Sequence, residues 1–191
     1  MELCGYRLLL ASNSPRRQEL LQQMDVDFEV FVKQGIDESY PSDIPSALVP
    51  EYLAKKKAQS YKEDLSDGDL LITADTIVLL EDRILGKPHD TYEAKEMLGA
   101  ISGRSHRVIT GVALTSSDKQ ISFSEETIVR VGKLTISQLD YYIQNYKPFD
   151  KAGGYGIQEW FGHVAIDAIE GSFNNVMGLP TQRIFAEISS F

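Results

Sequence analysis

Residues 70–80 read Leu-Leu-Ile-Thr-Ala-Asp-Thr-Ile-Val-Leu-Leu. Apolar and β-branched side chains fill this stretch, with only residues 73–76 interrupting them, which predicts a buried central strand. A carboxylate inside such a strand costs several kcal/mol if it is buried and unpaired. Asp75 must therefore be paired, bind a metal or open onto a cleft. The alternative is that Asp75 is a paired structural aspartate at a strand end or bulge. We favour a functional role for Asp75, because Thr73 and Thr76 add oxygen ligands beside it.

Strand-like and helix-like segments alternate on both sides of this strand. Ser14 is the expected N-cap and Pro15 the first residue of a helix that runs to about Met24. Asp90 and Glu93 form a capping-box-like pair before another helix. Further strands are expected at 7–11, 28–33, 105–115 and 121–134. A loop is expected at 37–50, followed by a basic helix that ends near residue 61. Two more helices are expected near 137–145 and 180–190, and a hairpin tip at 81–83. The pattern predicts one α/β domain over residues 1–191 with a mixed sheet rather than a purely parallel one.

Charge and composition exclude several classes of protein. The chain of 191 residues has a formal net charge of −9 and a pI near 4.8, which argues against nucleic-acid binding because that requires many neutralised phosphates. The single cysteine, Cys4, excludes an intramolecular disulfide and suggests a reducing compartment. Near the N-terminus, the apolar run at residues 8–11 is too short for a signal peptide or a membrane span. We therefore expect a cytoplasmic protein that binds neither nucleic acid nor membranes.

The first predicted strand leads into a helix N-terminus with the sequence Ser12-Asn13-Ser14-Pro15-Arg16-Arg17. The free N–H groups and the dipole of a helix N-terminus suit a phosphate group. Arginines in the first turn are unfavourable for the dipole, by tenths of a kcal/mol to about one, unless an anion lies nearby. An anion site is therefore slightly favoured over the alternative, a capped surface helix with solvated arginines.

Residues 149–158 read Phe-Asp-Lys-Ala-Gly-Gly-Tyr-Gly-Ile-Gln. Three glycines in four positions indicate a backbone that a ligand approaches closely, or several turns with positive φ. Tyr155 could stack on a base, and Gln158 could read a base edge with its donor and its acceptor. The alternative is a tight connector with a core tyrosine.

Several other groups are weak signals individually. The adjacent carboxylates of Asp37 and Glu38 suit Mg²⁺, and Lys87 lies in a constrained turn, but either feature is common on solvated surfaces. Lysines 55–57 form a basic helix face that is usually only solubilising. The three histidines show no metal-like spacing, so neither a zinc site nor a Cys–His nucleophile is favoured. The sequence has no P-loop or Rossmann fingerprint.

Taken in order, these segments resemble the Maf family, which comprises house-cleaning nucleotide pyrophosphatases related in fold to the inosine triphosphate pyrophosphatases. The matching segments are residues 10–17, 36–38, 54–58, 74–78, 86–88, 102–106, 150–158 and 176–180. Each motif is modest alone, but the ordered set is specific and spans nearly the whole chain. The resemblance implies an elongated mixed sheet flanked by helices, with two lobes around a cleft.

The resemblance also implies a role for each matching position. Asp75 matches the family's general base. A divalent cation, Mg²⁺ or Mn²⁺, is implied with Asp37, Glu38 and Asp75 as its ligands, and which of Asp37 and Glu38 binds it stays open. The positions around the triphosphate are Ser12, Ser14, Arg17, Lys57 and Lys87.

Three positions near the base divide the family. One group carries Arg, Thr and Gln and prefers dTTP and UTP, whereas another carries Trp, Gln and Glu and prefers 7-methyl-GTP. Arg16, Thr76 and Gln158 match the first group. The implied reaction converts dTTP and UTP to the nucleoside monophosphate and pyrophosphate, and the resemblance also allows modified pyrimidine nucleoside triphosphates as substrates. The resemblance also allows a homodimer, which composition does not test.

Two rival functions remain at this level. A general metal-dependent phosphatase would release phosphate rather than pyrophosphate, so product analysis separates the two enzymes. A nucleotide-binding regulator of cell division or septum formation would bind without turnover. The presence of Asp75 beside a complete set of cationic positions argues against the regulator, because binding alone does not require it.

Overall fold

The computed structural model describes residues 5–191, and the chain forms two compact units. Unit 1 contains the described residues up to Asp75, together with Thr110–Glu125 and Gly178–Phe191. Unit 2 contains Thr76–Ile109 and Glu126–Met177. Cys4, on which the prediction about disulfides rests, lies outside the described residues.

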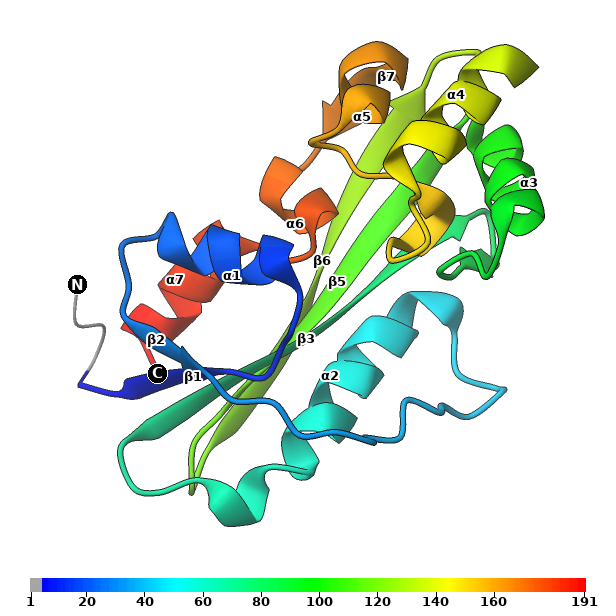
Figure 1. Ribbon diagram of the computed structural model, residues 1–191. Coiled ribbons are helices and arrows are strands. Elements are labelled where there is room, and N and C mark those ends of the chain that lie inside the picture. The colour runs from blue at the N-terminus through cyan, green and yellow to red at the C-terminus, as the bar shows by residue number, and fades with distance from the viewer. Residues whose placement is uncertain (1–4) are drawn as a thin grey trace. The chain divides into compact units, whose positions relative to one another are not determined.

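The described strands form one mixed sheet of seven strands (Figure 1). They are β1 (Arg7–Leu10), β2 (Phe28–Val30), β3 (Asp69–Leu80), β4 (Arg83–Leu85), β5 (Ser105–Thr115), β6 (Gln120–Val131) and β7 (Ile166–Glu170). Their order is β2-β1-β3-β5-β6-β7, and β4 pairs with β3. Because β1 is parallel to β2 and β3, while β3–β4 and β6–β7 are antiparallel, the prediction of an α/β fold with a mixed sheet is confirmed.

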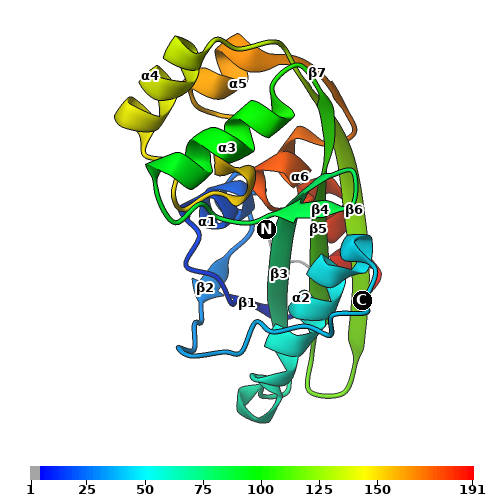
Figure 2. The same ribbon diagram turned by 90° about the vertical axis from the view of Figure 1, so that its right-hand side faces the viewer.

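In unit 1, helices cover both faces of β1 and the adjoining part of β3. Helices α1 (Pro15–Gln22) and α7 (Thr181–Ser189) lie on one side, and α2 (Val49–Gln59) lies on the other (Figures 1 and 2). Since alternate strand residues point to opposite faces, Leu9 and Leu71 share a face and pack with Tyr61, which follows α2. The short 3₁₀ helices are η1 (Ser46–Leu48) and η2 (Lys62–Asp64).

Helix α2 lies directly against β5 because position 111 is a glycine. A Cβ atom added to Gly111 would lie only 2.1 Å from the backbone N of Glu51, which is closer than real atoms approach. Next to this contact, Ala54, Ala58 and Ala113 form a buried cluster of small side chains. The close approach fixes the helix that carries Lys57 at a short distance from the sheet.

Unit 2 contains helices α3 (Thr91–Ile101), α4 (Ile136–Tyr146), α5 (Trp160–Ala165) and α6 (Phe173–Met177), with the 3₁₀ helix η3 (Ala152–Gly154). Helix α3 contacts both α4 and η3. Its N-cap is Asp90, whose side chain accepts a hydrogen bond from the Glu93 backbone N–H at 2.8 Å, as predicted. The Glu93 carboxylate accepts from the backbone of His89 rather than from that of Asp90, so only half of the capping box forms.

The structure differs from the sequence-based prediction in several places. Strand β2 ends at Val30 rather than at residue 33, and β6 ends at Val131 rather than at residue 134. The last part of the expected loop at 37–50 forms η1 and the start of α2. Ser14 lies at the N-cap of α1 but makes no side-chain capping bond, and the helix ends at Gln22 rather than near Met24. The short elements α5, β7 and α6 were not predicted.

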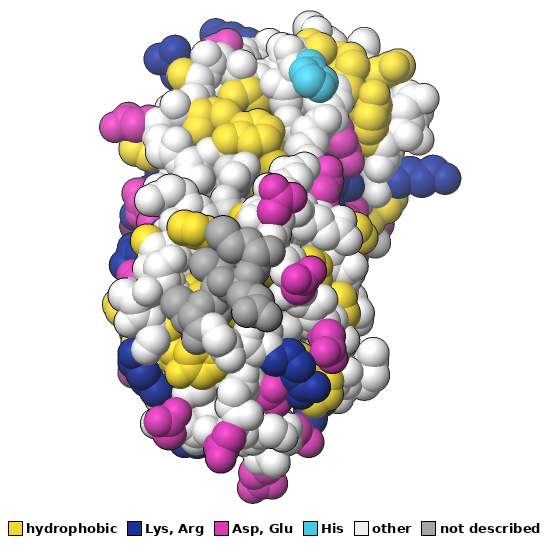
Figure 3. Space-filling view, turned by 90° about the vertical axis from the view of Figure 1, so that its left-hand side faces the viewer, with side chains coloured by type: hydrophobic (Ala, Val, Ile, Leu, Met, Phe, Trp, Pro, Cys, Tyr) yellow, Lys and Arg dark blue, Asp and Glu magenta, His cyan; other side chains and the backbone are white. Residues whose placement is uncertain are grey.

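In the described part of the chain, no helix has the length and apolarity needed to span a bilayer. On the face shown in Figure 3, acidic and basic side chains are interspersed.

Candidate active site

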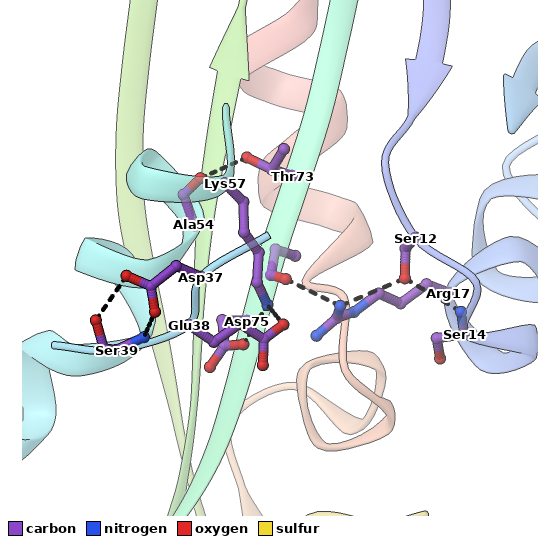
Figure 4. A network of polar contacts seen from close by, with 11 residues as sticks. Ser12, Ser14, Arg17, Asp37, Glu38, Ser39, Ala54, Lys57, Thr73 and Asp75 are labelled. Atoms are coloured by element: carbon purple, nitrogen blue, oxygen red, sulfur yellow. Dashed lines mark hydrogen bonds and ion pairs between the residues drawn. The ribbon is translucent and has the colours of Figure 1, made fainter. Parts of the chain in front are cut away.

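Asp75 lies in a cluster of charged side chains in unit 1 (Figure 4). The Lys57 ammonium lies 2.6 Å from Asp75 Oδ1 and 3.0 Å from Glu38 Oε1. The side chains of Lys57 and Asp75 are only 14% and 16% exposed, whereas Glu38 is 63% exposed. One ammonium group thus contacts two carboxylates, and a partly desolvated pair of this kind leaves a costly unpaired charge if either partner is removed.

A buried hydroxyl holds the strand of Asp75 against the helix of Lys57. Thr73, which is fully buried on β3, donates from Oγ1 to the Ala54 carbonyl of α2 at 2.8 Å. Because Ala54 lies one helical turn before Lys57, this bond fixes the helix one turn away from the ion pair. The Thr73 hydroxyl is therefore structural, and the suggestion that it adds an oxygen ligand is not supported.

Arg17 joins the first turn of α1 to two other segments of unit 1. Its Nε donates to the Gly178 carbonyl at 2.8 Å, and its Nη1 donates to the Ala74 carbonyl at 2.9 Å. Burial lowers the pKa of the guanidinium, while the charge of Asp75 acts in the opposite direction. An arginine keeps its charge in proteins, so Arg17 places a positive charge beside the strand that carries Asp75.

The turn before α1 is organised around Ser12. The buried Ser12 Oγ accepts from the Ser14 backbone N–H at 3.2 Å and lies 3.5 Å from Arg17 Nη1. The Ser12 carbonyl accepts from Gln18 Nε2 at 3.2 Å. The two serines and the arginine predicted to bind phosphate therefore lie together, and Arg16 immediately precedes Arg17 in the first turn of α1.

The three carboxylates predicted to hold a metal do not gather in one place. Asp37 accepts hydrogen bonds from the Ser39 backbone and hydroxyl and pairs with Lys56 Nζ at 2.7 Å. The bond from Lys56, followed by those from Ser39, holds the pKa of Asp37 well below its usual range. Figure 4 shows Glu38 beside Asp75, with Asp37 turned toward Ser39. Residues 5–191 contain no group of three His, Cys, Asp or Glu side chains arranged for a metal.

The remaining predicted site residues, Thr76, Lys87 and Gln158, belong to unit 2. The Gly153 backbone N–H donates to the Gly86 carbonyl at 2.9 Å, so the glycine-rich segment lies beside the turn that carries Lys87. Both Lys87 and Gln158 are exposed, and Thr76 is half-buried on β3. Gln158 also lines a pocket of about 360 Å³ within this unit.

The glycine-rich segment contains tight turns, as one of the two interpretations predicted. Gly153 and Gly154 have φ of 69° and 72°, and a Cβ on Gly153 would lie 2.8 Å from the Val78 side chain. Tyr155 is buried, and its hydroxyl lies 2.7 Å from Nε2 of His106. The idea that Tyr155 stacks on a base is therefore wrong: burial and its bond to His106 make it a core residue.

Two side chains around this segment were not singled out from the sequence. His106 contacts Tyr155, and the Tyr142 hydroxyl contacts both Gly156 and Glu159. Tyr142 lies on the apolar face of an amphipathic helix, where its type and spacing indicate only a core position. No local motif distinguishes such a tyrosine, because its partners lie 14 and 17 residues further along the chain.

Known proteins match this chain over nearly its whole length. Residues 7–191 match the family model described as Maf-like protein. A dTTP/UTP pyrophosphatase of Parabacteroides distasonis is 52% identical, with 97% of this chain and 96% of that protein covered. Another from Flavobacterium psychrophilum is 46% identical, with coverages of 94% and 91%.

A solved structure gives independent support for the fold. The HAM1 protein from Coxiella burnetii aligns with a TM-score of 0.50 at 13% identity, over 97% of this chain and 100% of that one. At this level of identity the likeness concerns the fold alone, and it agrees with the predicted fold class. The family model and the close relatives together cover the site segments described above, and the chain therefore belongs to the Maf family.

Proposed function

We propose that the protein is a nucleoside triphosphate pyrophosphatase that hydrolyses dTTP and UTP. The main support is the cluster of Asp75, Lys57 and Glu38, set near the turn of Ser12 and Arg17 in the same unit. Cutting a triphosphate between its α- and β-phosphates requires positive charge for the phosphate oxygens and a group that accepts a proton from water. This cluster supplies both kinds of group.

In the proposed reaction, one water molecule breaks the α–β anhydride and Asp75 accepts a proton from that water. The products are the nucleoside monophosphate and pyrophosphate. Lys57 and Arg17 hold phosphate oxygens, with Ser12 and Ser14 in the adjoining turn. Lys87 is a further proposed phosphate-binding residue. Before substrate binds, the Lys57 ammonium offsets the repulsion between the carboxylates of Asp75 and Glu38, which it contacts at 2.6 and 3.0 Å.

The donor set fits a divalent cation such as Mg²⁺ or Mn²⁺. Mg²⁺ typically binds through one or two carboxylates together with substrate phosphates and water. Here the carboxylates of Glu38 and Asp75 both contact the Lys57 ammonium group. Glu38 and Asp75 would hold the metal. When bound, it supplies charge neutralisation for the phosphates and lowers the pKa of a coordinated water.

Asp37 provides a matched control for this metal assignment. Because its carboxylate is directed to Lys56 and Ser39, Asp37→Asn should leave the metal concentration for half-maximal activity nearly unchanged. Glu38→Gln should raise that concentration by about tenfold, since a carboxylate ligand is lost. The reverse ranking would assign the metal to Asp37 instead.

Base selection is assigned to Arg16, Thr76 and Gln158. The Gln158 amide offers one acceptor and two donors, which can complement the N–H and carbonyl of a thymine or uracil edge. The close relatives named dTTP/UTP pyrophosphatase support this preference. A pyrimidine should therefore be selected by hydrogen bonding rather than by size alone.

A panel of canonical and modified nucleoside triphosphates with Mg²⁺ or Mn²⁺ tests the proposal. Pyrophosphate, phosphate and monophosphate are measured separately. Stoichiometric pyrophosphate from dTTP and UTP is the expected result. Release of phosphate alone would identify a general phosphatase, and binding without turnover would identify a nucleotide-binding regulator.

A further inference from the structure

Tyr142 connects the two residues that flank Ile157 and Gln158. Its hydroxyl accepts a hydrogen bond from the Gly156 backbone N–H at 2.9 Å and donates to Glu159 Oε2 at 2.5 Å. The backbone N–H of Glu159 also donates to the Gly156 carbonyl at 3.2 Å. Residues 156–159 therefore form a closed turn whose two ends bind the same hydroxyl group.

A buried lysine holds the other side of this turn. Lys151 Nζ lies 3.0 Å from Glu159 Oε1 and 2.7 Å from Asp150 Oδ1, and its side chain is only 10% exposed. A buried ammonium requires such partners, so Lys151 restricts the Glu159 carboxylate. Both oxygens of that carboxylate are thus bound, one by Tyr142 and one by Lys151.

The turn also has little room to change its shape. A Cβ atom on Gly156 would lie 2.7 Å from Glu159 Cδ and 3.0 Å from Lys151 Cε, so these groups pack directly on the glycine backbone. Ile157 is 7% exposed and belongs to the core of unit 2. Gln158 is exposed and is the residue that this turn presents to solvent.

The ring of Tyr142 packs independently of its hydroxyl. It lies 5.1 Å from Tyr146, 5.3 Å from Phe161 and 6.2 Å from Trp160, centroid to centroid. In Figures 1 and 2, α4 and α5 accordingly lie together within unit 2. Burial and the Glu159 carboxylate raise the pKa of the Tyr142 hydroxyl, which therefore stays protonated and able to donate at neutral pH.

We propose that Tyr142, with Glu159 and Lys151, is a positioning group that fixes the backbone of residues 156–159, from which the Gln158 side chain extends, and thereby sets the base selectivity of the enzyme. This inference rests on the proposed role of Gln158 as a reader of the base. Gln158 lines a pocket with His163 and Phe173, and Phe173 is 45% exposed. If the backbone under Gln158 moves, its amide loses alignment with the base edge that it pairs with, and a misaligned hydrogen bond is weak. A base that makes no such bond is unaffected by the movement.

The test uses Tyr142→Phe, which keeps the ring and removes the hydroxyl. The readout is the ratio of kcat/KM for dTTP to kcat/KM for GTP, measured alone and combined with Gln158→Ala. We expect Tyr142→Phe to lower this ratio by about tenfold, mainly through KM for dTTP, because an oriented hydrogen bond to the base is weakened. In the Gln158→Ala background the same change should alter the ratio by less than about twofold.

Tyr141→Phe is the matched control, since Tyr141 is the neighbouring tyrosine of α4 and is 48% exposed. It should leave the ratio unchanged. Amide hydrogen exchange of Gly156 gives a second readout, which should accelerate in Tyr142→Phe and not in Tyr141→Phe. If Tyr142→Phe does not fold, Glu159→Ala replaces it, with the same expected and contradicting results.

The outcomes separate this inference from the proposed function. If Gln158→Ala leaves the ratio unchanged, Gln158 is not a base reader and the inference fails with that role. If Gln158→Ala collapses the ratio while Tyr142→Phe does not change it, Gln158 keeps its role and the positioning network is refuted. An equal effect of Tyr142→Phe in both backgrounds would also refute positioning, because the change would then act independently of Gln158.

Discussion

His106 should make the stability of the protein depend on pH in a range above that of ordinary carboxylates. The residue is 2% exposed, and its Nε2 lies 2.7 Å from the Tyr155 hydroxyl. Its Nδ1 is buried and has no hydrogen-bond partner among the described residues. A protonated ring would place a charge and a second N–H donor in this environment, so burial lowers the pKa of His106 to about 4.

The sign of the effect follows from which state binds the proton. Between pH 6.5 and pH 4 the unfolded chain protonates this histidine while the folded protein does not, so stability rises with pH. Above about pH 6.5, His106 does not reduce the free energy of unfolding. As the pH falls from there toward 4, the free energy of unfolding decreases. With a folded pKa of about 4 and an unfolded value of about 6.5, His106 alone should remove about 2 kcal/mol of unfolding free energy between pH 7.5 and pH 5.

Urea denaturation of the wild type and of His106→Gln at these two pH values measures the effect. The loss on acidification should be about 2 kcal/mol smaller in the variant. His89→Asn is the control, because His89 is exposed, and its pH dependence should match that of the wild type. An equal loss in wild type and His106→Gln would refute the reasoning. If His106→Gln does not fold, NMR titration of wild-type His106 replaces the comparison, and a midpoint near pH 6.5 would contradict it.

Two other substitutions test the site and its support. Lys57→Ala should lower kcat/KM for dTTP by about 100-fold, because a charge that contacts Asp75 is removed. The neighbouring Lys56→Ala should change kcat/KM by less than about threefold. Similar losses for the two variants in steady-state assays would contradict the role assigned to Lys57. Gly111→Ala should lower the unfolding free energy by about 3 kcal/mol or more through overpacking against α2. Gly99→Ala, which has open space around the added methyl group, should be neutral or slightly stabilising, and thermal denaturation that ranks the two variants equally would contradict the close approach.

The strands and long helices could be predicted from the sequence because each carries its own pattern. The apolar residues 70–80 form the strand β3, and the helix from Pro15 begins where a proline fits. Elements α5, β7 and α6 could not be predicted, because they are five or six residues long and are held by the surrounding packing rather than by a repeated apolar face. Ser14 lies at the predicted N-cap, but its backbone N–H binds the Ser12 hydroxyl and its own side chain makes no cap.

The pairing of the charged side chains in the candidate site could not be predicted from the sequence. Adjacent residues Asp37 and Glu38 look equivalent in sequence, yet the structure directs Asp37 to Lys56 and Glu38 to Lys57. Adjacent side chains on a helix or an extended loop point in different directions, and only the fold determines which partner each one meets. The aromatic ring of Tyr155 likewise suits base stacking, but Tyr155 is buried and its hydroxyl contacts His106, so it belongs to the core.

The most direct test of the central claim is the rate of pyrophosphate release from dTTP by Asp75→Asn at saturating metal. Asp140→Asn is the control, since it removes a surface carboxylate that pairs only with Lys95 among the contacts described for it. If Asp75 accepts the proton from water, its substitution should lower kcat by about 100-fold or more, and the control should retain the wild-type rate. An Asp75→Asn enzyme that keeps most of its activity would show that another group activates the water and that Asp75 has a structural role beside Lys57.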